Sequence, residues 1–216
     1  MTEQNFEQMR RAMVASQLRT TGVNDPRVVA AMSTVPRERF VPADRVPMAY
    51  ADTLVPLGNG RDLNSPMSLG RMLTEAAPHH EDKALVIGAA TGYAAAVLAE
   101  LVASVVAVEE DPALVAMARQ ALSGSGVKLV EGPLTKGHKA GAPYDLILID
   151  GAVEFVPDAI VAQLAENGRL AVAMLVGGVA QISIGRRGGA GFGTAAVSDA
   201  ASAILPGFAK PRGFTF

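Results

Sequence analysis

The chain contains no cysteine among its 216 residues. Disulfide bonds, a thiolate nucleophile and zinc sites with cysteine ligands are therefore excluded. The three histidines, His79, His80 and His138, do not have the spacing of a metal-binding motif, so we expect no metal site. Spacing also reveals no Ser-His-Asp group and no pair of carboxylates suited to acid-base catalysis. A reducing compartment is consistent with this composition.

Strong charge and long apolar segments are missing as well. The formal net charge is -2 and the sequence pI is about 5.9, so no overall field attracts nucleic acid or anionic membranes. The most apolar stretch, residues 84–108, is cut by Gly88, Gly92 and Glu100 into strand-length and helix-length pieces. The polar residues 1–5 lack the basic and then apolar order of a signal peptide. We therefore expect a cytoplasmic protein that binds neither nucleic acid nor membranes.

The apolar residues that are present suffice for one core. Half of the residues are hydrophobic, and 216 residues are the length of one ordinary domain. Within this single domain, residues 1–78 are expected to form a helical N-terminal cap and residues 79–216 an α/β core. Helical spacing of apolar residues predicts a first helix from Glu3 to Thr20, and Asp25 before Pro26 predicts the start of a second.

The stretch from Lys83 to Glu109 predicts a strand, a glycine turn, a helix and a second strand. The run 84–87 is short and wholly apolar, as in a parallel strand that is covered on both faces. Ligands of open α/β sheets bind beyond the carboxyl ends of the strands. Glu109 ends the second strand and follows Gly88 at the spacing, about 20 residues, of an acid that binds ribose hydroxyls. This stretch therefore predicts a nucleotide-type site.

The rest of the chain continues the alternation of strands and helices. Glycine clusters after residue 176 predict that an antiparallel hairpin finishes the sheet. The predicted helices are 112–122 and 157–165, and the predicted strands are 127–130, 142–149, 169–175 and 180–185, with a turn at 188–191. Asp150 follows the strand 142–149, and Asn167 with Gly168 is predicted to stop the helix 157–165 in a left-handed conformation.

The residues around the glycine turn resemble the corresponding sequence of one protein family. Residues 87–99 resemble the segment Ile-Gly-Thr-Gly-Ser-Gly-Tyr-Gln-Ala-Ala-Val-Leu-Ala of protein-L-isoaspartate O-methyltransferases. Similar stretches cover most of the chain. They are Gln17-Leu18-Arg19, Val35-Pro36-Arg37, Ala49-Tyr50-Ala51-Asp52, Pro56-Leu57-Gly58-Asn59-Gly60, Ala142-Pro143-Tyr144-Asp145 and Gly168-Arg169-Leu170. The resemblance implies a Rossmann-like S-adenosylmethionine methyltransferase fold, with a mostly parallel sheet, a C-terminal antiparallel hairpin and an N-terminal helical cap.

The resemblance also implies an activity and a site. The activity is methyl transfer from S-adenosylmethionine to the carboxylate of L-isoaspartyl residues in damaged proteins or peptides. Glu109 is expected to bind the cofactor ribose, and Asn64 or Ser65 to donate to the substrate carboxylate, because the family's active-site serine aligns with Asn64 while the serine here comes one place later. The other expected cofactor-binding residues are Gly88, Ala89, Ala90, Thr91, Gly92, Gly132, Pro133, Leu134 and Asp150.

Several motif positions depart from the family. Val86 stands for an acid, Ala90 for a glycine, Pro133 for an aspartate and Asn64 for the serine. Lost hydrogen-bonding partners cost about 1 to 3 kcal/mol each where a buried group goes unpaired. Two alternatives therefore stay open: a catalytically weakened member that acts as a binding or interaction module, and a methyltransferase for another small acceptor. Ser65 has an equal alternative, since it could simply cap the helix that begins at Pro66. The sequence leaves the oligomeric state open.

Overall fold

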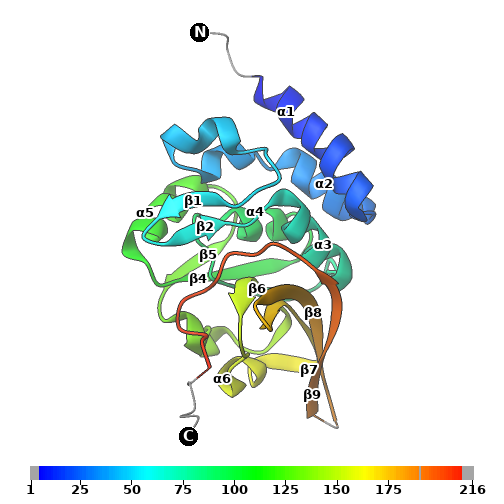
Figure 1. Cartoon of the computed structure of the whole chain (residues 1–216). Coiled ribbons are helices and arrows are strands. Elements are labelled where there is room, and N and C mark those ends of the chain that lie inside the picture. Colours follow the sequence, from blue (N-terminus) through cyan, green and yellow to red (C-terminus); the bar gives the residue numbers. More distant parts are fainter. Residues whose placement is uncertain (1–4, 190, 211–216) are drawn as a thin grey trace, which may run out of the picture.

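The computed structural model describes residues 5–189 and 191–210, and these form a seven-stranded mixed sheet with helices on its faces (Figure 1). The strand order is β5-β4-β3-β6-β7-β8-β9. Neighbours from β5 to β7 pair in parallel, whereas β8 and β9 are antiparallel. The strands are β3 (Lys83–Ile87), β4 (Ser104–Glu109), β5 (Lys128–Glu131), β6 (Tyr144–Val153), β7 (Leu164–Val176), β8 (Val179–Gly188) and β9 (Gly191–Asp199). The predicted α/β fold with a C-terminal antiparallel hairpin is confirmed; Ala190 of the predicted turn lies outside the described residues.

Two cores cover the two faces of the sheet because strand side chains alternate between faces. Ala84 and Val86 of β3 pack with the N-terminal helices and with α3 (Pro66–Ala76), α4 and α5. Leu85 and Ile87 pack on the other face, where α6 and the residues after β9 supply the cover. The central strands are therefore buried on both sides, as their uninterrupted apolar runs predict. The helices that follow β3 in the chain are α4 (Tyr93–Ala99), α5 (Pro112–Ala121) and α6 (Asp158–Val161).

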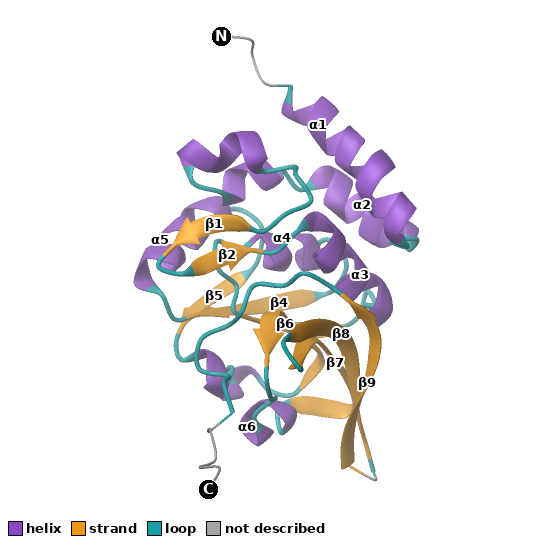
Figure 2. Ribbon diagram, viewed as in Figure 1, coloured by secondary structure: helices purple, strands orange, loops and turns teal. Residues whose placement is uncertain are grey.

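The N-terminal region is mostly helical (Figure 2). Helix α1 (Phe6–Met13) continues into a π-helical turn at 14–18 and a 3₁₀ turn at 19–21, and Gly22 ends it in a left-handed conformation. Residues 3 and 4 of the predicted helix lie outside the described residues. Helix α2 (Pro26–Thr34) starts as predicted, with Asp25 accepting from the Arg27 backbone N–H at 2.8 Å. Among the described helices, none has the length and apolarity that a membrane crossing requires.

A small second sheet lies between this helical region and helix α3 (Pro66–Ala76). Strands β1 (Val55–Gly58) and β2 (Arg61–Leu63) pair antiparallel around the turn Asn59-Gly60. The sequence indicates only a turn-rich segment there, because neither strand is long enough to show an alternating pattern. The Ser65 hydroxyl accepts from the Ser68 backbone N–H at 3.3 Å and caps α3. The predicted capping role of Ser65 is confirmed.

Several predicted elements differ in length, and the helix before β7 is among them. The helix predicted over 157–165 spans only Asp158–Val161, and strand β7 already begins at Leu164. The backbone N–H of Tyr144 donates to the Gln163 carbonyl, and the Gln163 side chain donates to the carbonyls of Lys136 and Ala159. These contacts end the helix early because they draw residue 163 to the start of β6 and the loop after β5. Asn167 is left-handed as predicted, with φ of 62°, but within β7.

Candidate active site

The turn after β3 has the backbone that a glycine-rich ligand loop needs. Three alternate residues, Gly88, Ala90 and Gly92, have positive φ angles of 76°, 50° and 99°. The alternation of positive φ angles explains why the family segment Gly-Thr-Gly-Ser-Gly has glycine at every second position, since glycine adopts positive φ at little cost. Ala90 holds the left-handed conformation with a Cβ, which strains the backbone. The backbone N–H groups of Gly88 and Ala89 both donate to the Val108 carbonyl, and the Thr91 hydroxyl donates to the Phe40 carbonyl at 2.6 Å.

Glu109 at the end of β4 is completely buried and fully hydrogen-bonded. The Arg61 guanidinium donates to both carboxylate oxygens, at 2.7 and 3.0 Å. The backbone N–H of Ala90 donates to Oε2 at 2.7 Å, and those of Glu110 and Asp111 donate to Oε1 at 2.9 and 3.1 Å. Glu109 therefore lies beside the glycine loop, where the sequence predicts the ribose-binding acid. It is ion-paired with an arginine that no sequence pattern predicts.

The β1–β2 hairpin brings this arginine to the carboxyl edge of the sheet. Its turn residue Asn59 donates to the Asp111 carboxylate at 2.9 Å, at the start of α5. This hydrogen bond from Asn59 is the main reason that the pKa of Asp111 lies below its ordinary value. The hairpin thus attaches to the end of β4 at two points, one through Asn59 and one through Arg61. Arg61 itself is buried with Glu109, so the ion pair is shielded from water.

Asn64 and Asp150 form a second buried polar group. The Asn64 amide donates to Asp150 Oδ1 at 2.7 Å, and Asn64 Oδ1 accepts from the Ala203 backbone N–H at 2.8 Å and from the Ser202 hydroxyl at 3.2 Å. Burial raises the pKa of the Asp150 carboxyl, while the hydrogen bond from Asn64 opposes the shift. Asp150 stands within β6, which continues to Val153, and not directly after a strand. Asn64, the predicted substrate-binding amide, is therefore hydrogen-bonded to the Asp150 carboxyl group and to residues 202 and 203.

A buried arginine, Arg37, contacts the backbone of Asn64. Arg37 has no exposed surface, and it donates to the carbonyls of Ala49 and Asn64, both at 2.6 Å. Its guanidinium carbon lies 4.6 Å from the centre of the Tyr93 ring, at the first turn of α4. Burial lowers the pKa of Arg37, and the nearby Tyr93 and Asp150 oppose this shift. Arg37 thus ties the helical region to the residue that aligns with the family's active-site serine.

The loop after β5 forms the third part of the site. The Gly132 N–H donates to the Glu109 carbonyl at 3.0 Å, and the Leu134 N–H donates to the Glu110 carboxylate at 3.3 Å. Leu134 is buried, whereas Pro133 is exposed. The structure thus places the predicted residues 132–134 beside the Glu109 group, at the same edge of the sheet as the glycine loop.

Residues 201–208, which we call the C-terminal segment, cross this edge after β9. In Figure 1 the segment is drawn in red and runs over the arrowhead of β6. The backbone N–H of Ala152 donates to the Ala203 carbonyl at 2.6 Å, and that of Leu205 donates to the Ala152 carbonyl at 2.9 Å. A Cβ built on Gly88 would lie 2.8 Å from Leu205 Cδ2. The first glycine of the loop is therefore covered by a leucine from the far end of the chain.

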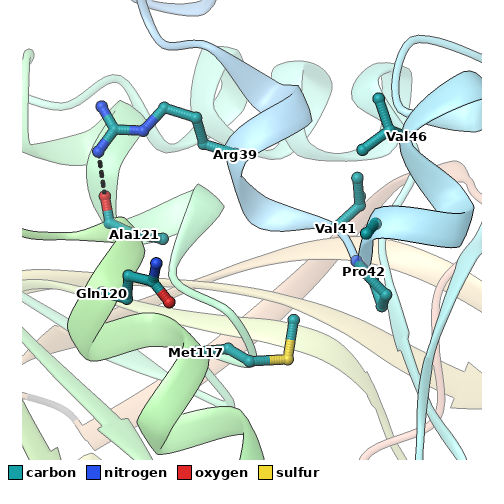
Figure 3. Close-up of a pocket in the computed structure, with 8 residues that line it drawn as sticks. Arg39, Val41, Pro42, Val46, Met117, Gln120 and Ala121 are labelled. Carbon is teal, nitrogen blue, oxygen red and sulfur yellow. Dashed lines mark hydrogen bonds between the residues drawn. The ribbon is translucent and has the colours of Figure 1, made fainter.

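A separate pocket lies away from these residues. It has a volume of about 470 Å³ and lies between the segment 39–46 and the carboxyl-terminal part of α5 (Figure 3). Arg39 donates to the Ala121 carbonyl at 3.4 Å at one side of it, and Met117 is among its lining residues. No residue predicted for cofactor or substrate lines it.

Three contributors to the site have no direct signal in the sequence: Arg61, Arg37 and the C-terminal segment. Arg61 follows a turn, Arg37 follows a proline, and residues 201–208 have no periodic pattern. Each acts through a partner far away in the chain, and local spacing contains no signal for such partners. The one indirect signal is the family resemblance of Val35-Pro36-Arg37. It indicates that this stretch matters, but it does not predict that Arg37 contacts Ala49 and Asn64.

Comparisons with known proteins agree on one family. The family model described as Protein-L-isoaspartate(D-aspartate) O-methyltransferase matches residues 9–187. A protein-L-isoaspartate O-methyltransferase of Methanoregula boonei is 43% identical over 166 residues, which cover 76% of this chain and 76% of that protein. Another, from Koribacter versatilis, is 40% identical over 166 residues, covering 76% and 75% of the two chains.

Solved structures of the same kind share the fold. A protein-L-isoaspartate O-methyltransferase superposes with a TM-score of 0.80 at 20% identity, over 93% of this chain and 66% of that chain. A Plasmodium falciparum protein, described as a protein-L-isoaspartate O-methyltransferase in complex with S-adenosyl-L-homocysteine, superposes with a TM-score of 0.77 at 17% identity. The match covers 94% of this chain and 99% of that chain.

Proposed function

We propose that this chain, which belongs to the protein-L-isoaspartate(D-aspartate) O-methyltransferase family, methylates L-isoaspartyl carboxylates in damaged proteins or peptides with S-adenosylmethionine. The family match over residues 9–187 carries this proposal. The site agrees with it, because the turn after β3 has positive φ at each of the three alternating positions and Glu109 ends the next strand.

The residues present fit the cofactor in kind and position. Bound S-adenosylmethionine supplies a sulfonium methyl group, which a carboxylate attacks directly without a protein nucleophile. The loop 88–92 is proposed to receive its methionine part, Glu109 its ribose, and residues 132–134 its adenine. In the described conformation Glu109 is saturated with donors, so binding by this route requires Arg61 to give up part of its contact.

The acceptor side of the site is proposed to work by alignment and exclusion of water. Asn64 has two amide donors, of which one is already used by Asp150, so the other can orient a substrate carboxylate. Arg37, held to the Asn64 carbonyl, keeps this amide in place without touching the acceptor. Holding the two reactants in line accounts for much of the catalysis such a reaction needs.

A cytoplasmic location and damaged isoaspartyl proteins as partners belong to the proposal as well. The role of residues 1–78 as a cap that completes the site on the core 79–216 is also proposed. Its support is that Arg37, Arg61 and Asn64 reach the sheet edge from this region. Fractionation of cells and recovery of the protein with the soluble cytoplasmic fraction would test the location.

The decisive test is transfer of radiolabelled methyl from S-adenosylmethionine to an isoaspartyl peptide and to the same peptide with aspartate. We expect base-labile label on the isoaspartyl peptide only. Asn64→Ala should lower the transfer, and Arg119→Ala, on the exposed side of α5, is the matched control that should not. Label on neither peptide, with cofactor binding intact, would favour a different acceptor. Absence of cofactor binding in every variant would favour a weakened, non-catalytic member.

A further inference from the structure

The C-terminal segment lies where the cofactor of the proposed function would bind. Its Leu205 is 3% exposed and packs on two strand ends at once. On one side, Cβ atoms built on Gly88 would lie 2.8 and 2.9 Å from the two methyl carbons of Leu205. On the other side, a Cβ on Gly151 of β6 would collide with the same side chain. Leu205 therefore fills the space in front of both glycines.

This space is the topological switch point of the sheet. From β3, the chain order runs through β4 to β5 on one side and through β6 to β7 on the other. Open α/β sheets bind their ligands at such a point, outside the carboxyl ends of the strands. In such loops the first glycine makes the tight turn, and the second lets the backbone approach a ligand closely. In this structure the Leu205 side chain packs against the first glycine, Gly88, beside that position.

The segment continues over the neighbouring part of the site. A Cβ built on Gly207 would lie 3.2 Å from Thr135 Cγ2, in the loop after β5 that is expected to contact the adenine. At its other end, Ala203 and Ser202 donate to Asn64, the amide expected to orient the substrate. The segment therefore contacts all three parts of the proposed site. Leu205 lies at the position proposed for the methionine part, Gly207 at that for the adenine, and Ala203 at that for the acceptor.

We propose that the C-terminal segment is an autoinhibitory latch, which occupies the cofactor cleft and has to leave it before S-adenosylmethionine binds. This inference rests on the proposed function, because that function defines the cleft. Asn64 ties the latch to β6, because its amide nitrogen donates to Asp150 while its amide oxygen accepts from the Ala203 backbone N–H.

The way the segment is held makes release feasible. Its inward residues Ala203, Leu205 and Phe208 are buried, whereas Ile204, Pro206 and Gly207 between them are exposed. The segment pairs with the rest of the sheet through a single β-bridge, Ala152 with Ile204. Leu205 and Phe208 anchor the segment in the core, and the Glu154 backbone N–H donates to the Phe208 carbonyl at 3.1 Å. Local opening of one such segment costs less free energy than unfolding of the whole domain. Release would uncover the glycine loop without breaking any strand pairing of the seven-stranded sheet.

Binding affinity gives the first test. Calorimetric titration of the full chain with S-adenosylmethionine and with S-adenosylhomocysteine should give a dissociation constant about tenfold or more lower for Leu205→Ala, because an equilibrium with a closed state reduces apparent affinity by the competent fraction. Ile204→Ala is the matched control, since its side chain is 67% exposed on the same segment, and it should bind like the unmodified chain. Equal or weaker binding by Leu205→Ala would overturn the latch, because a leucine that merely forms the wall of the cleft contributes to affinity.

Hydrogen exchange on the unmodified chain gives a second test that needs no variant. The amides of Ala152, Ala203 and Leu205 are all hydrogen-bonded across the latch. Saturating S-adenosylhomocysteine should speed their exchange while it slows exchange in the loop 88–92. Slower exchange at all of these amides would show that the segment stays closed over the cofactor, and would overturn the proposal.

The two tests separate failure of the latch from failure of the proposed function. If the unmodified chain binds cofactor as well as Leu205→Ala does and methylates isoaspartyl peptide, the latch is wrong and the function stands. If Leu205→Ala binds cofactor more tightly but neither chain methylates the peptide, the latch stands and the acceptor is wrong. If neither chain binds cofactor, both the latch and the function are wrong.

Discussion

Removal of Arg61 should reveal how much the buried ion pair with Glu109 contributes to stability. In Arg61→Met, an apolar side chain of similar length replaces the guanidinium and leaves a carboxylate with no exposed surface. Two charge-assisted hydrogen bonds, at 2.7 and 3.0 Å, are lost. Each bond of this kind is worth about 1.5 to 3 kcal/mol. The carboxylate keeps three backbone donors, from residues 90, 110 and 111, which limit the loss.

We therefore expect Arg61→Met to lower the free energy of unfolding by about 3 kcal/mol, the lower end of the range for a broken buried pair. Urea denaturation followed by far-UV circular dichroism at neutral pH measures this change through the midpoint at constant slope. Arg119→Met is the matched control, because Arg119 is exposed on α5 and its replacement should change stability by less than about 0.5 kcal/mol.

A loss below about 1 kcal/mol in Arg61→Met would contradict the reasoning, because only solvent-exposed ion pairs contribute so little. It would mean that water reaches Glu109 when the arginine is removed, or that the three backbone donors alone keep the carboxylate stable. Replacing Glu109 in addition, as in Arg61→Met with Glu109→Met, should not restore full stability. The three N–H groups would then lack an acceptor, which costs about 1 to 3 kcal/mol for each buried group.

Three further predictions concern single residues of the site. Ala90→Gly should raise the free energy of unfolding by about 1 kcal/mol in denaturant titration, because Ala90 has a φ of 50°; a loss of stability would show that the Ala90 methyl contributes packing that outweighs the strain. Burial raises the pKa of Asp150 above its unfolded value, so the stability it contributes is present at low pH and is lost as pH rises through the folded pKa. Asp150→Asn should therefore stabilise the chain more at about pH 8 than at about pH 5 relative to the unmodified chain, and a pH-independent difference in unfolding midpoints would contradict this. Ser65→Ala should cost about 1 kcal/mol through the lost cap of α3 and leave methyl transfer unchanged at a temperature where the variant is folded, whereas a lower transfer rate there would assign Ser65 a contact with the substrate.

Local patterns in the sequence determined the central architecture. The apolar run 84–87, the glycine turn and the helix after it specify a strand-turn-helix unit, since each depends on residues a few positions apart. The caps at Asp25 and Ser65 were equally predictable, because a cap bonds to an N–H two or three residues on. The family resemblance then indicated the activity and predicted that the loop 88–92 belongs to the cofactor site.

Tertiary structure alone decided which groups meet at the sheet edge. Arg61 meets Glu109 across 48 positions of the chain, and Ala203 meets Asn64 across 139. Such pairs depend on the path of the hairpin and of the C-terminal segment over the sheet, and no short-range spacing encodes that path. The predicted length of helix α6 was wrong for the same reason, because Gln163 donates to the Lys136 carbonyl and accepts from the Tyr144 backbone N–H, on two other segments. Side-chain periodicity reports which residues are buried, but the choice of partner for a buried charge or amide is made only when distant strands come together.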